Sequence, residues 1–247
     1  MNLRATAAWL VLAGAAALAG CASDKPPPTP LEPVEAKIAG RQVWAANVSR
    51  VGFPLVPAAH GGVFFAASGD GEVLALQADS GAVVWRANAG GALSAGVGSD
   101  GRFTSVVTRG NEVVTFENGR ELWRKRMPSS VVTPPLVAGE RVFVMGVDRA
   151  VHAFDAIDGR RLWALQRPGE ALTLAQAGVI AAFRNTLLVG QGARLAGVDP
   201  LRGSVLWEVP MASPRGTNEV ERLADLLGPA VRVGELVCAR AFQSAVA

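Results

Sequence analysis

The chain has 247 residues, half of them apolar, with 28 glycines, no tyrosine and a formal net charge of +3. This length can bury a sizeable core. The charge is too small to favour a nucleic-acid-binding protein, and the densest basic run, Arg124–Arg126, has no aromatic stacking residues beside it. The two histidines, His60 and His152, are too few for a metal site unless carboxylates supply the other ligands.

The N-terminus has the pattern of a signal peptide. One positive charge at Arg4 precedes an unbroken run of apolar and small residues, Ala5–Ala17, which suits a signal-peptide core and is too short to span a bilayer comfortably. The run ends in Leu18–Cys21 (LAGC), which resembles the bacterial lipobox. That resemblance implies cleavage before Cys21 and attachment of lipid to its thiol. The alternative is an ordinary signal peptide with a chance cysteine.

A proline-rich stretch follows the cysteine. Five prolines fall between Asp24 and Ala36, and such a stretch prefers an extended, semi-rigid conformation. At about 3.1 Å per residue it would hold a folded body roughly 40 Å from the anchor. Ala22, in place of an aspartate after the cysteine, is typical of lipoproteins of the outer membrane, so we expect a lipid-anchored protein on its periplasmic face. We divide the chain into signal peptide, lipidated cysteine with tether, and folded body: 1–20, 21–36 and 37–247.

The body repeats one pattern, a glycine four residues ahead of a tryptophan. Successive tryptophans of the series are 41, 38, 40 and 44 residues apart. A period of about 40 residues with turn residues at fixed offsets is typical of a repeat architecture. The pairs are Gly40–Trp44, Gly81–Trp85, Gly119–Trp123, Gly159–Trp163 and Gly203–Trp207.

Each repeat is expected to contain about four short antiparallel strands. Many of these strands are apolar on successive residues, which indicates that both faces are covered, and sheets stacked radially explain that burial. We therefore predict an all-β fold, a β-propeller whose outer-strand tryptophans fill the gap between adjacent blades. The expected strands are 62–67, 72–76, 82–85, 103–108, 112–116, 141–146, 150–154, 186–189, 194–198, 228–233 and 235–242, with shorter innermost strands at 53–57 and 132–137 and a ring-closing strand at 43–48.

The repeat resembles the pyrroloquinoline-quinone-type propeller repeat over Gly40–Trp207. Quinone-dependent dehydrogenases share it, and they typically carry an adjacent Cys-Cys disulfide and calcium ligands. This sequence has no Cys-Cys pair, and its aspartates fall in hairpin turns, where they cap the turn. We therefore expect no catalytic residue, no cofactor and no metal. A periplasmic dehydrogenase-like protein remains the alternative.

Lipobox, tether and repeat together resemble the BamB family, lipoprotein subunits of the machine that assembles β-barrels in the bacterial outer membrane. The stretch 170–176 resembles the family's loop whose leucines contact BamA, and 215–225 resembles an insertion ending in Glu-x-x-Arg-Leu-x-Asp. Ala175 and Leu227 depart from the family's arginine and second aspartate. The resemblance implies partner contacts by Leu172, Leu174, Glu221, Arg222 and Asp225. The alternatives are core packing for the leucines and internal ion pairs for the charged residues.

The implied function is a non-catalytic scaffold that docks to BamA and other assembly-machine subunits. Its clients would be unfolded outer-membrane proteins, and its strand edges could accept client strands by β-augmentation. The resemblance implies an eight-bladed ring, of which this sequence covers roughly half to five-eighths. A truncated, non-functional fragment is a further alternative. Cys238 lies in an apolar strand, and we expect a buried, inert thiol there.

Overall fold

The computed structural model describes residues 40–52, 56–166, 172, 174–214, 216–243 and 245–246. The signal peptide, Cys21 and the tether lie outside the described residues. The chain divides into two units, Met1–Arg41 and Gln42–Ala247, and the architecture below is that of the second. Over the described residues, no helix is both long and apolar enough to cross a membrane.

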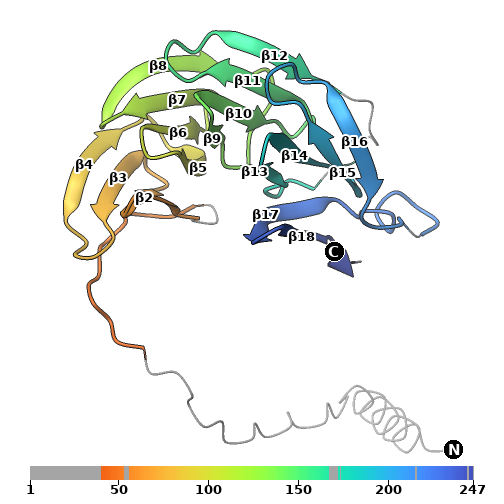
Figure 1. Cartoon of the computed structure of the whole chain (residues 1–247), viewed down its shortest axis with the longest axis horizontal. Helices are drawn as coiled ribbons and strands as arrows, with labels where there is room; N and C mark the ends of the chain where they lie inside the picture. Colours follow the sequence, from red (N-terminus) through yellow and green to blue (C-terminus); the bar gives the residue numbers. More distant parts are fainter. Residues whose placement is uncertain are drawn as a thin grey trace, which may run out of the picture. The chain divides into compact units, whose positions relative to one another are not determined.

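The second unit consists of antiparallel sheets built from consecutive strands, which follow one another in chain order (Figure 1). We number the sheets 1 to 5 along the chain. Sheet 1 contains β1 (Ala58–His60), β2 (Val63–Ala67), β3 (Glu72–Gln77) and β4 (Val83–Asn88). Sheet 2 contains β5 (Leu93–Ser99), β6 (Phe103–Thr108), β7 (Glu112–Glu117) and β8 (Arg120–Arg126). Sheet 3 contains β9 (Leu136–Ala138), β10 (Arg141–Met145), β11 (Val151–Asp155) and β12 (Arg161–Leu165).

The last two sheets continue the pattern. Sheet 4 contains β13 (Ile180–Phe183), β14 (Thr186–Gln191), β15 (Arg194–Val198) and β16 (Val205–Pro210). Sheet 5 contains β17 (Leu226–Val233), β18 (Leu236–Ala241) and β19 (Ala245–Val246). The sequential four-stranded sheets confirm the predicted blades.

The innermost strands lie later in the chain than the sequence suggested. We expected them at 53–57 and 132–137, whereas they are β1 and β9; residues 53–55 lie outside the described part. Pro57, Pro134 and Pro135 explain the shift, because a proline has no N–H to donate to the ladder. The expected closing strand at 43–48 is also wrong, since these residues are described without a strand assignment.

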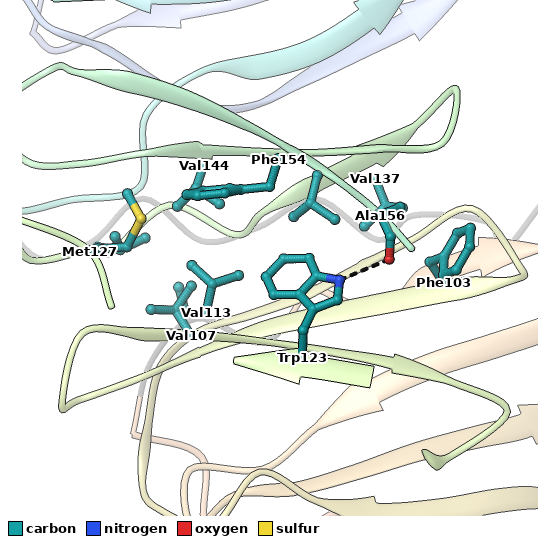
Figure 2. Close-up of a cluster of buried hydrophobic side chains, with 12 residues drawn as sticks. Phe103, Val107, Val113, Trp123, Met127, Val137, Val144, Phe154 and Ala156 are labelled. Carbon is teal, nitrogen blue, oxygen red and sulfur yellow. Dashed lines mark hydrogen bonds between the residues drawn. The ribbon is translucent and has the colours of Figure 1, made fainter. Parts of the chain in front are cut away.

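The core lies between adjacent sheets. One buried cluster joins Phe103, Val107 and Val113 of sheet 2 to Val144 and Phe154 of sheet 3, with Trp123 between them (Figure 2). Equivalent clusters join sheets 1 and 2, 3 and 4, and 4 and 5. Burial on both faces explains why β2 (VFFAA) and the middle of β3 (VLAL) are apolar without alternation.

The tryptophans connect one blade to the turn of the next. The indole Nε1 of Trp123 donates to the Ala156 carbonyl at 2.9 Å, and Trp163 donates to the Pro200 carbonyl at 3.0 Å. Each ring also covers the glycine that opens the next repeat's Gly-x-x-x-Trp pattern. The covered glycines are Gly81 under Trp44, Gly119 under Trp85, Gly159 under Trp123 and Gly203 under Trp163.

Trp207 departs from this pattern. Its ring covers Gly197 on β15 of its own sheet, and 42% of the residue is exposed. Neither Gly228 nor Gly234 of sheet 5 has the indole among the nearest atoms around its Cβ position. Within the described residues the Trp207 ring therefore contacts its own sheet, and a role for it between blades stays a prediction.

Cys238 is exposed, which corrects the expectation of a buried thiol. Strand β18 alternates its faces, so Ala239 and Ala241 enter the cluster between sheets 4 and 5 while Cys238 points to the other side. The apolar run around Cys238 thus does not show which of its residues another sheet covers.

Candidate partner-docking surface

The stretches around Leu172 and Asp225, which the sequence analysis identified as candidate partner contacts, lie at one end of sheets 3, 4 and 5. The β10–β11 turn and the β14–β15 turn lie together, since Arg149 of the first and Gly192 of the second line the same cavity. The segments that lead into β13 and β17 reach the same end. We call Arg149, Leu172, Leu174 and Asp225 the docking surface.

Arg149 contacts two other segments of this surface. It sits in the β10–β11 turn with a positive φ of 62°, in the left-handed region that only a minority of non-glycine residues adopt. Its Nη2 atom lies 3.0 Å from Asp225 Oδ1 and donates to the Leu172 carbonyl oxygen at 3.3 Å. One side chain therefore links three segments that are far apart in sequence.

Asp225 uses both carboxylate oxygens. Oδ1 accepts from Arg149, and Oδ2 accepts from the Leu174 backbone N–H at 2.9 Å. The Arg149 and Asp225 side chains are only 15% and 14% exposed, so water screens this pair much less than a surface ion pair. Removing one partner would leave the other charge poorly solvated.

Backbone bonds hold the same segments in place. Leu226 N–H donates to the Gly192 carbonyl at 2.8 Å, and Gly228 N–H donates to the Ala177 carbonyl at 2.9 Å. Gly178 N–H donates to Thr133 Oγ1 at 2.9 Å. The loops of the docking surface are thus tied to sheets 3, 4 and 5.

The two leucines differ in exposure. Leu172 is 36% exposed, whereas Leu174 is half-buried. Leu172 lines a cavity of about 350 Å³ together with Arg149, Arg222, Leu223 and Asp225. Core packing therefore does not account for Leu172, and its side chain is available at the surface.

Glu221 and Arg222 lie on the adjoining loop. The Glu221 carboxylate accepts from the Thr217 N–H at 2.8 Å and from Thr217 Oγ1 at 3.0 Å, and these bonds hold the pKa of Glu221 below its usual value. Glu221 is fully exposed and stabilises its own turn. Arg222 is exposed and lines the cavity. The structure thus brings Leu172, Leu174 and Asp225 into one cluster, with Glu221 and Arg222 beside it.

Arg149 is the residue that sequence reasoning missed. It lies in an Asp-Arg-Ala turn that looks like any other hairpin turn of the repeat. Its partner Asp225 is 76 residues away. No local pattern signals a contact over that separation.

The described residues contain no group of three or more histidine, cysteine, aspartate or glutamate side chains that could hold a metal ion. His152 is 7% exposed, and burial lowers its pKa. It stacks on Phe154 at a ring-centroid distance of 6.3 Å.

Sequential four-stranded sheets tied by outer-strand tryptophans define the chain as a β-propeller protein. The solved structure of BamB from Moraxella catarrhalis aligns with a TM-score of 0.69 at 21% identity, over 81% of this chain and 62% of that one. A quinohemoprotein alcohol dehydrogenase from Comamonas testosteroni aligns with a TM-score of 0.53 at 14% identity, over 77% of this chain and 40% of that one. At these identities both likenesses show the fold alone.

Sequence comparison gives the family. A family model described as "Outer membrane protein assembly factor BamB" matches residues 34–92 and 69–247. The protein of that name from Bordetella pertussis is 36% identical over 99% of this chain, and the one from Burkholderia pseudomallei is 35% identical over 98%. The chain belongs to the BamB family. It spans about two-thirds of the length of these relatives, 66% in each case.

Proposed function

We propose that this chain is a non-catalytic scaffold of the machinery that assembles outer-membrane β-barrels, and that its docking surface contacts BamA. Relatives over nearly the whole chain are named as outer membrane protein assembly factors. The observation that carries the proposal is the Arg149–Asp225 pair, which holds the Leu172 and Leu174 segment at the end of the sheets.

The geometry suits a binding site more than a packing contact. Leu172 presents an apolar side chain beside a cavity. Arg149 binds the Leu172 carbonyl, and Asp225 binds the Leu174 N–H. A preorganised loop loses little entropy on binding, so more of the contact energy appears as affinity. An apolar anchor with polar residues around it is the usual anatomy of a protein interface.

The N-terminal parts complete the proposal. Residues 1–20 would direct export, and lipid on Cys21 would anchor the mature chain at the periplasmic face of the outer membrane. Buried methylene groups contribute about 0.8 kcal/mol each, so two or more chains give stable anchoring. The tether at 21–36 would let the propeller reach partners away from the bilayer. Unfolded outer-membrane proteins would be the clients of the assembled machine.

The quinone-dehydrogenase alternative has less support. The dehydrogenase structures share only the fold at 14–15% identity, and the sequence lacks an adjacent cysteine pair. We propose that the propeller carries loops for binding and performs no reaction.

Co-purification tests the docking claim. We would replace Leu172 and Leu174 with alanine together in the full chain and measure recovery of BamA from solubilised outer membranes. The proposal predicts a loss of at least tenfold. Val84→Ala is the control, because Val84 is 48% exposed on β4, far from this surface in sequence. Equal recovery with all three chains would reject the docking surface.

A further inference from the structure

A second cleft lies between sheets 3 and 4, at the end of these sheets opposite the docking surface. It is formed by the β9–β10 turn of sheet 3 and by the β13–β14 and β15–β16 turns of sheet 4. Its volume is about 460 Å³, which is within the range of ligand pockets in proteins. We call it the Arg141 cleft.

The cleft is largely apolar. Phe143 and Leu187 line it and are buried, with 2% and 1% exposure. Leu201 and Leu206 also line it and are 59% and 56% exposed. Covering such exposed side chains with another apolar group is favourable, because it removes apolar surface from water.

Arg141 brings a guanidinium with one unpaired N–H to this cleft. Its Nη1 donates to the Gly139 carbonyl at 2.8 Å. Its Nε is buried and has no hydrogen-bond acceptor within the part of the chain that the structure describes. A buried donor left unpaired is unfavourable, because it loses its hydrogen bond to water and gains none in the protein. An anionic acceptor placed in the cleft would remove that cost.

The other charged residues of the cleft already have partners. Arg184 forms an ion pair with Glu235. The Asp199 carboxylate accepts from the Leu201 N–H at 2.8 Å and from Arg202 at 3.3 Å, and the Leu201 bond is the main reason that the pKa of Asp199 lies below its usual value. Among the described lining residues, Arg141 is therefore the cation available to a ligand.

The equivalent positions of sheets 1 and 2 show that the fold does not need an arginine here. Arg141 begins β10 and pairs with the last residue of β11. Phe103 begins β6 and pairs with Glu117 in the same way, and Val63 begins β2 and pairs with Gln77. Sheet 2 has an arginine one residue before this position, at Arg102. Arg102 forms ion pairs with Glu117 and Glu140.

We propose that the Arg141 cleft binds an extended peptide segment of a partner protein, in which an acidic side chain lies next to a bulky apolar one. The carboxylate accepts hydrogen bonds from Arg141, and charge-assisted bonds of this kind are stronger than neutral ones. The apolar neighbour packs against Leu201 and Leu206. This inference goes beyond the proposed docking to BamA and does not depend on it, because the cleft uses different turns.

Fluorescence anisotropy with the purified full chain tests the cleft. The probe is a dye-labelled peptide, blocked at both ends, that carries aspartate followed by phenylalanine. We expect saturable binding to the wild-type chain, at least tenfold weaker binding to Arg141→Gln, and the same loss when asparagine replaces aspartate in the peptide. Combining both changes should add little further loss, because they remove the same contact.

Controls make each outcome decisive. Arg120→Gln, an exposed residue of β8, should bind as the wild type does. Leu201→Ser changes an exposed side chain and should weaken binding several-fold without loss of folding. Absence of saturable binding, or equal affinity of Arg141→Gln and wild type, would overturn the proposal. Binding that requires an unblocked C-terminus would also overturn it, and would assign the cleft to chain ends.

Discussion

The indole of Trp123 lies over Gly159 of the next sheet and donates its Nε1–H to the Ala156 carbonyl at 2.9 Å (Figure 2). A Cβ atom on Gly159 would come within 2.6 Å of the ring. The glycine and the tryptophan of one Gly-x-x-x-Trp pattern thus take part in two different contacts. The glycine packs under the tryptophan of the preceding repeat, and the tryptophan packs over the glycine of the next.

Gly159→Ala should destabilise the propeller by about 2–4 kcal/mol. The methyl group would meet the Trp123 ring, and the φ of +69° is unfavourable for alanine. Denaturant unfolding followed by far-ultraviolet circular dichroism measures the change. Gly139→Ala is the matched control, since Gly139 has a φ of +58° and nothing within 4 Å of its Cβ position; it should cost about 1 kcal/mol. Equal losses would show that the ring contact is unimportant.

Trp123→Ala and Trp207→Ala should differ strongly. Trp123 is 7% exposed between sheets 2 and 3, and its truncation should cost about 3–5 kcal/mol. Trp207 is 42% exposed, so its truncation should cost less than half as much. The same unfolding experiment compares them. A loss at Trp207 as large as that at Trp123 would contradict the burial described here.

Asp225→Ala should loosen the segment that leads into β13. It removes the acceptor of the Leu174 N–H and the ion pair between Asp225 and Arg149. We expect amide hydrogen exchange at Leu174 to accelerate at least tenfold. Asp79→Ala is the control, because Asp79 lies in the β3–β4 turn of sheet 1. Unchanged protection at Leu174 would show that Asp225 does not order this segment.

His152 should make stability depend on pH. Burial lowers its pKa from the ordinary value of 6.5, the Asp148 charge opposes this shift, and the Arg161 charge adds to it. The unfolded chain therefore binds a proton at a pH where the folded chain does not. The contribution of neutral His152 is complete above about pH 6.5 and is lost as the pH falls below that value.

His152→Leu should weaken this dependence. We expect the free energy of unfolding to drop less between pH 7.5 and pH 5.5 in this variant than in the wild type. Val84→Ala, which changes an exposed side chain that does not titrate, should keep the wild-type slope. Identical slopes for the wild type and His152→Leu would exclude His152 as the titrating group.

The sequence predicted the blades because their signals are local. Strand β6 has the expected bounds 103–108, and β15 has the expected bounds 194–198. The Arg149–Asp225 pair could not be predicted, since it depends on how two turns from different blades meet. Cys238 was misassigned for a related reason: a residue pattern shows which strand carries a side chain, but not whether a neighbouring sheet covers it.

Site-specific photo-crosslinking tests the central claim most directly. A photoreactive amino acid at position 172, introduced into the full chain in cells, would report what contacts the docking surface. We expect a crosslink to BamA from position 172 and none from position 84 on β4. A crosslink to BamA from position 84 alone, or from neither position, would contradict it.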